Sequence, residues 1–152
     1  MAITAREARE KILDDLGTAV DQLAVAVASL GDAYELLTVA PADRLEAELY
    51  RPVQKAYGRA KRTHAQFAER CGLPGREFAT PAAGRPSQGV KSFIDRALIA
   101  AAEADRAIAD LQDTMLPIES GDPELRTGLS EVRELLTDLN AAAREFQRTL
   151  GR

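Results

Sequence analysis

The sequence predicts an all-α protein, arranged as an antiparallel up-down-up-down four-helix bundle with long, heptad-patterned helices. Three observations lead to this class. Apolar residues recur at alternating spacings of three and four, which keeps one narrow stripe of a helix facing a partner. Alanine and arginine, both strong helix formers, fill 28 and 16 of the 152 positions. Aromatic residues, which favour strands, make up only 5% of the chain.

The first helix is expected over residues 4–38. Thr4 followed by Glu7 forms a capping-box pattern, which marks a helix start. The apolar stripe keeps its phase past Gly17 and Gly31, so we expect one helix that tolerates both glycines. The stripe consists of Leu13, Leu16, Val20, Leu23, Val27, Leu30, Tyr34 and Leu37.

The second helix is expected over residues 41–72, with a kink near Pro52. A proline inside a helix removes one hydrogen bond and clashes with the preceding turn, and the apolar spacing becomes irregular at this point. Residues 73–86 contain three prolines and two glycines and show no periodicity. They form the one long loop, which is either a functional lid or a packed cap with Phe78 as its anchor.

The third and fourth helices are expected over residues 87–118 and 122–150, each with an unbroken apolar stripe. Asp122 and Pro123 supply an N-cap and a first-turn proline for the fourth helix. Short turns join the helices on either side of the long loop, which favours up-down-up-down order. At about 3.3 Å per residue the loop could just reach the far end of a bundle, so we expect a crossover to be strained. Residues 1–152 then form one helical-bundle domain.

The inward stripes hold little that could perform chemistry, so we favour a non-enzymatic protein over an enzyme. Those of the first, third and fourth helices contain no Asp, Glu, His or Cys, and the chain has a single histidine. We therefore expect no metal and no cofactor. In an enzyme, His64, a tyrosine and the basic residues of the second helix would be the actors. Cys71 lies two helical turns beyond His64, about 10 Å away, which is too far for a direct dyad.

A basic ridge on the second helix is the leading candidate for a binding surface. Arg51, Lys55, Arg59 and Arg62 fall within about 80° of one another on a helical wheel, opposite the apolar stripe. One interpretation is a solvated face that pairs with nearby acids. The other is a docking surface for an acidic or phosphorylated partner, or for an anionic small molecule. On the second interpretation, the protein is a binding or assembly module.

The loop offers a second set of groups to such a partner, since Arg76, Phe78 and Arg85 lie within it. The alternative function is a small-molecule binder with an apolar pocket between the first, second and third helices. Its candidate residues are Tyr34, Tyr57, His64 and Ala101. Against a pocket stands ordinary packing, in which tyrosine rings fill the core and alanines bring the helices closer together.

The overall charge narrows the classes of partner. A net charge of −4 argues against general binding to nucleic acid or to an anionic membrane. A protein partner or self-association is expected instead, because an apolar stripe can also be shared across a two-fold axis. The single cysteine, and a start without the pattern of a signal peptide, predict a cytoplasmic location. The excess of arginine over lysine, with abundant alanine, is common in proteins from GC-rich bacteria.

Overall fold

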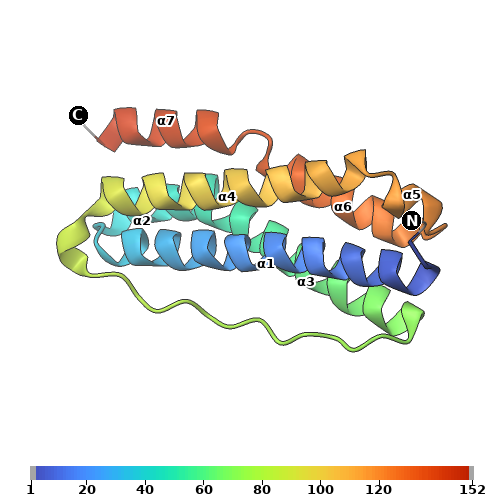
Figure 1. The fold of residues 1–152 in the computed structure, drawn as a ribbon. Coiled ribbons are helices and arrows are strands. Elements are labelled where there is room, and N and C mark those ends of the chain that lie inside the picture. Colours follow the sequence, from blue (N-terminus) through green and yellow to red (C-terminus); the bar gives the residue numbers. More distant parts are fainter. Residues whose placement is uncertain (1–2, 151–152) are drawn as a thin grey trace.

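The computed structural model describes residues 3–150, and this range contains helices and loops but no strand (Figure 1). The all-α class is confirmed. The α-helices are α1 (Ala5–Glu35), α2 (Val39–Leu45), α3 (Arg51–Cys71), α4 (Val90–Asp113), α5 (Leu116–Glu119), α6 (Pro123–Leu136) and α7 (Leu139–Leu150). A π-helical segment, Glu46–Tyr50, joins α2 to α3, and a 3-10 turn, Pro86–Gln88, precedes α4.

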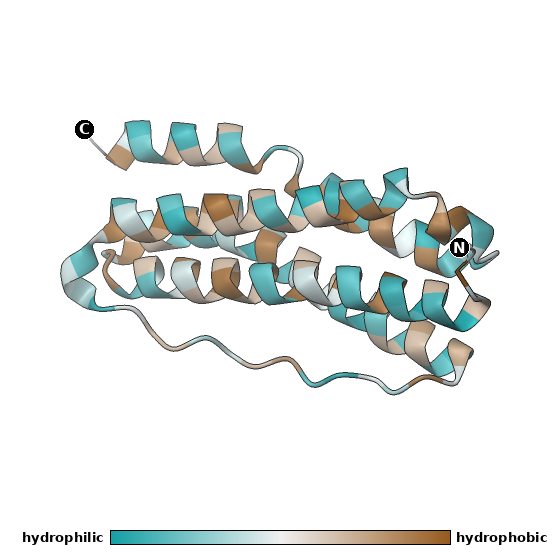
Figure 2. Ribbon diagram, in the orientation of Figure 1, coloured by the Kyte–Doolittle hydropathy of each residue, from teal (hydrophilic) through white to brown (hydrophobic). Residues whose placement is uncertain are grey.

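The heptad stripes form the core. In α1 the side chains of Leu16, Val20 and Leu23 are fully buried, as predicted. The start of α1 is also as expected, because the backbone N–H of Glu7 donates to Oγ1 of Thr4 at 3.1 Å. Apolar and polar residues alternate along each helix in Figure 2, as expected when one side of a helix is buried.

Helices α1 and α3 run antiparallel, and so do α3 and α6. Gly17 near the start of α1 lies by His64 in the second half of α3, and Gly31 near its end lies by Tyr50, just before α3. The second pair is fixed by two ion pairs. They join Arg70 to Asp122 and Arg59 to Glu131.

Helices α1 and α4 make the most extensive contact in the molecule, and they also run antiparallel. Near the end of α1, Asp32 accepts a hydrogen bond from the backbone N–H of Gly84, which lies against Phe93 near the start of α4. Near the start of α1, Asp15 lines a groove with Asp110 at the end of α4. Both α3 and α4 are therefore antiparallel to α1 and parallel to each other.

The expected up-down-up-down order is therefore wrong, and the order is up-down-down-up. Residues 73–85, which we call the strap, run back along the molecule as an extended segment (Figure 1). The strap passes from beside Leu13 to Asp32, a distance of about 29 Å along α1 at 1.5 Å per residue. Its residues 73–84 could span about 36 Å at 3.3 Å per residue, so the crossover is not strained. One such crossover is a known variant of helical bundles.

The irregularity expected near Pro52 lies just before that proline. The helix continues from Val39 to Cys71 through the π-helical segment Glu46–Tyr50, where the N–H of Arg51 donates to the carbonyl of Glu46, five residues back. Pro52 has no N–H to donate, and its ring crowds the preceding turn. The wider π turn accommodates this and shifts the phase of the helix by one residue, which is why the apolar spacing is irregular.

Two of the expected helices end early and continue as separate pieces. Helix α4 ends at Asp113, and Met115 takes a left-handed conformation with φ 67° before α5. Helices α6 and α7 are separated at Thr137 and Asp138. The Thr137 hydroxyl donates to the carbonyl of Arg133, and the Asp138 carbonyl accepts the first backbone bond of α7. Threonine and aspartate both favour helix ends, so the helix breaks here although the spacing of its apolar residues continues. No helix between residues 3 and 150 has the length and apolar character needed to cross a bilayer.

Candidate functional site

The four residues of the predicted basic ridge lie on α3, but the structure separates one of them from the rest. Nε of Arg59 donates to Oε2 of Glu131 on α6 at 2.5 Å, and its side chain is mostly covered. Arg51, Lys55 and Arg62 remain exposed. We call these three residues the α3 strip.

The α3 strip carries little compensating negative charge. Arg51 lies 3.6 Å from Glu46, a separation beyond hydrogen-bonding range, and over half of its side chain is exposed. Within residues 3–150, Lys55 and Arg62 make no ion pair. No acidic residue occurs in α3 before Glu69. The strip is therefore an exposed cationic surface with little negative charge beside it in the described part of the chain.

The structure does not bring together the four residues of the predicted apolar pocket. The ring of Tyr34 packs edge-on against Tyr50, at a centroid distance of 6.4 Å. Tyr57 lies under Nζ of Lys61, 4.9 Å from the ring centroid. The remaining two residues, His64 and Ala101, are buried in different places.

Ala101 lies on α4 and lines a groove of about 410 Å³ beside the α6–α7 break. None of the other three candidates lines that groove, and charged residues such as Asp105 and Arg133 take part in it. The alanines of α4 thus mainly allow close packing, as the competing interpretation held. Ala97, Ala101 and Ala104 are all at most 3% exposed.

His64 forms the most unusual site in the molecule, and it brings the strap into contact with α1 and α3. Its ring lies 5.2 Å from that of Phe78, at an interplanar angle of 88°. The guanidinium of Arg76 lies 4.5 Å from the Phe78 ring centroid, and its Nη2 donates to both carboxylate oxygens of Asp21 at 2.8 Å. The predicted anchoring role of Phe78 agrees with this arrangement.

Gly17 lets the strap lie close to α1 at this site. A Cβ atom placed on Gly17 would lie 2.9 Å from Nη1 of Arg76 and 3.9 Å from the ring of Phe78. Sequence reasoning treated Gly17 only as a tolerated helix position and missed its contact with Arg76. Because nothing in the local pattern of α1 reports a distant strap, the sequence held no signal for this role.

Burial lowers the pKa of His64 below its ordinary value of 6.5, and the Arg76 guanidinium lowers it further. A hydrogen bond with the backbone of Leu13 and the nearby carboxylate of Asp14 act in the opposite direction. His64 is only 4% exposed. The imidazole is therefore neutral at pH 7 and carries no charge into the groove.

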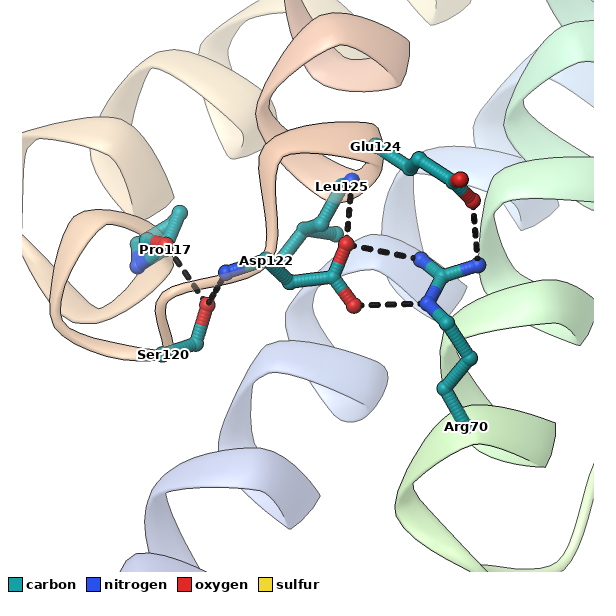
Figure 3. Close-up of polar contacts among 6 residues, drawn as sticks. All are labelled: Arg70, Pro117, Ser120, Asp122, Glu124 and Leu125. Atoms are coloured by element: carbon teal, nitrogen blue, oxygen red, sulfur yellow. Dashed lines mark hydrogen bonds and ion pairs between the residues drawn. The ribbon is translucent and has the colours of Figure 1, made fainter.

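A second polar cluster ties the end of α3 to the start of α6 (Figure 3). Arg70 donates from Nε and Nη2 to the two carboxylate oxygens of Asp122, at 2.7 and 2.9 Å, and from Nη1 to Glu124 at 2.9 Å. Asp122 also accepts from the backbone N–H of Leu125 at 3.0 Å and so caps α6. Because Arg70 and Asp122 use their polar atoms on each other and on the start of α6, we call this cluster a structural clamp.

Cys71 lies next to this clamp and is partly buried. Burial raises the pKa of its thiol above the ordinary value of 9.0, although Arg9 and Arg70 act to lower it. The thiol is therefore protonated at neutral pH.

Two further observations bear on function. Within the part of the chain that the structure describes, no three His, Cys, Asp or Glu side chains are grouped so that they could hold a metal ion. Comparison with protein-family models, with curated proteins and with solved structures found no match to this chain.

Proposed function

We propose that this chain is a non-enzymatic four-helix bundle with one crossover, and that it binds an acidic protein partner, phosphorylated or not, on the α3 strip. The observation that supports this function is the exposure of Arg51, Lys55 and Arg62 together, on a helix face that carries no acid. Pairing the strip within the chain would have been the simplest structural use of these cations. Arg59, outside the strip, is used in that way, and within the strip Arg51 has only the longer contact of 3.6 Å with Glu46.

The geometry of the strip sets the spacing of the acids that would fit it. Arg51 and Arg62 are about 16 Å apart along the axis of α3 at 1.5 Å per residue, and Lys55 lies between them. An acidic helix presenting carboxylates over three turns would match this length, and the planar fork of arginine suits carboxylate or phosphate. Since the surface is exposed, binding should be fast and should weaken as salt is added.

The test compares two variants with the same change in net charge. Lys55→Glu/Arg62→Glu reverses the strip, whereas Arg96→Glu/Arg106→Glu reverses two exposed arginines on α4. The probe is a fluorescent helical peptide with glutamates over three turns, and a glutamine version is its control. We expect the glutamate peptide to bind the native protein and the α4 variant but not the strip variant. Equal binding by both variants would contradict the proposal.

We also propose a cytoplasmic setting, in keeping with the single cysteine and the balanced mixture of charges. In this setting Cys71 would remain a reduced thiol.

A further inference from the structure

His64 is covered on one side by the strap alone. Helices α1 and α3 pack against His64 from the other sides. Their apolar residues form part of the buried core. The strap is a single extended segment with no layer above it (Figure 1). The residues that share the groove with His64 are Arg6, Glu10, Leu13 and Asp14 of α1, and Leu73, Pro74 and Arg76 of the strap.

The strap is held by a small number of contacts. The ion pair between Arg76 and Asp21 is about half exposed on both sides, and exposed pairs add little stability. Phe78 packs on His64, and Gly84 donates its N–H to Asp32 at the far end. Segments with few buried contacts are those that open locally while the rest of a protein stays folded.

The charges around His64 make its proton affinity depend on the position of the strap. Arg76 is the cation that opposes protonation, and it would move away with the strap. Asp14 favours protonation and would stay, because it belongs to α1. Arg6 and Glu10, which also line the groove, neutralise each other through an ion pair at 2.8 Å. Lifting the strap therefore removes the unfavourable charge, retains the favourable one and admits water.

We propose that residues 73–78 of the strap form a proton-gated cover, in which His64 takes up a proton as this segment lifts from the groove between α1 and α3. Mild acid then populates the open form, because a ligand shifts an equilibrium toward the state that binds it more tightly. In the open form the groove presents Leu13, Asp14, Gly17 and His64 to solvent. This inference is independent of the function proposed for the α3 strip.

The single histidine makes the first test direct, because NMR titration of the imidazole reports His64 alone. We expect a midpoint below pH 6.5 in the native protein. Phe78→Ala, which removes the cover over the ring, should move the midpoint up toward 6.5. Glu77→Gln is the matched control, since Glu77 is an exposed strap residue outside the groove, and it should leave the midpoint unchanged.

The second test follows the strap itself. The nuclear Overhauser contact between the ring of Phe78 and Gly17 reports whether the strap is closed, because the ring lies 3.9 Å from the Cβ position of Gly17. It should weaken between pH 7.5 and 5.5 in the native protein. A His64→Gln variant should lose this acid dependence. An unshifted histidine midpoint in Phe78→Ala, or equal acid-induced opening in His64→Gln, would overturn the proposal. If His64→Gln does not fold, the Phe78→Ala titration decides the question.

Discussion

Gly128 of α6 packs against the side chain of Thr63 of α3. A Cβ atom on Gly128 would lie 2.7 Å from Cγ2 of Thr63 and 3.1 Å from its Cβ, closer than packed side chains allow. Thr63 is 2% exposed, and its hydroxyl donates to the carbonyl of Arg59 at 2.8 Å, which fixes its rotamer. The pair thus sets how closely α3 and α6 approach.

Gly128→Ala is expected to destabilise the protein. Overpacking at a rigid contact costs about 1–3 kcal/mol, which outweighs the gain of roughly 1 kcal/mol from replacing a helical glycine by alanine. Urea unfolding measures the difference. In a Thr63→Ala background Oγ1 and Cγ2 are gone and only the Cβ atom remains, at 3.1 Å, so the same Gly128→Ala change should cost less than in the native protein. A destabilisation of equal size in both backgrounds would show that Thr63 is not the cause.

The Arg70–Asp122 clamp predicts an acid-dependent loss of stability. Burial raises the pKa of Asp122, but hydrogen bonds from Arg70 and from the N–H of Leu125 outweigh it and hold the pKa below 3.8. Ionised Asp122 therefore stabilises the folded state above pH 3.8, and this contribution is lost as the pH falls through the lower native value. Asp122→Asn keeps a capping side chain but removes the charge, so its unfolding free energy should fall less between pH 6 and pH 2.5.

Two matched variants separate the cap from the charge in this clamp. Asp122→Ala removes both and should cost about 1 kcal/mol more than Asp122→Asn at pH 6, since that is a typical value for an N-cap. Glu124→Gln changes a side chain that is 73% exposed, and it should shift stability by no more than about 0.5 kcal/mol. A large loss of stability in Glu124→Gln would show that Glu124, and not Asp122, is the carboxylate on which the clamp depends.

The left-handed backbone at Met115 predicts an unusual stabilising substitution. Met115 and Gly121 flank α5 with φ of 67° and 70°. A left-handed conformation costs a residue with a Cβ atom about 1–2 kcal/mol. Met115→Gly should therefore raise the free energy of unfolding by about 1 kcal/mol, less the extra chain entropy of glycine. Gly121→Ala should lower the free energy of unfolding. Urea denaturation of the two variants measures both changes, which should have opposite signs.

The middle of the strap should be the first site of proteolysis. Between Phe78 and Gly84 the chain is extended and largely exposed, and it contains three alanines. Elastase, which cuts after small residues, is expected to cleave there first and to leave the two halves associated through their shared core. Asp32→Ala removes the anchor of Gly84 and should speed cleavage several-fold. First cleavage within a helix instead would contradict this assignment.

The core could be predicted because its signal is local. The stripe residues Ile94, Ile108, Leu125 and Val132 are fully buried, since the spacing of apolar residues alone determines which side of a helix avoids water. Helix direction has no such signal. The choice between the two orders depended on whether the strap could span the molecule, and that distance is known only after the helices have been packed.

The candidate sites were predictable only in part, for the same reason. A helical wheel placed Arg59 next to Arg62, but it could not show that α6 would bring Glu131 to 2.5 Å from Arg59. His64 was named as a candidate from its own helix alone. Arg76, which changes its proton affinity, lies outside that helix, in the strap, where helical spacing gives no position for it. The spacing of residues predicts which face of its own helix a side chain lies on. It does not predict which side chains of other elements will contact it.

The crossover has a consequence for how the sequence can change. Between the anchors at Arg76 and Gly84 the extended chain could span about 26 Å at 3.3 Å per residue, whereas Asp21 and Asp32 are only about 16 Å apart along α1 at 1.5 Å per residue. This stretch therefore has slack. Added length costs little, because the entropy of closing a loop grows only with the logarithm of its length. A reporter peptide inserted between Ala79 and Ala83 should leave the helices in place, so the segment that decides the order of the helices is also the one most tolerant of insertion.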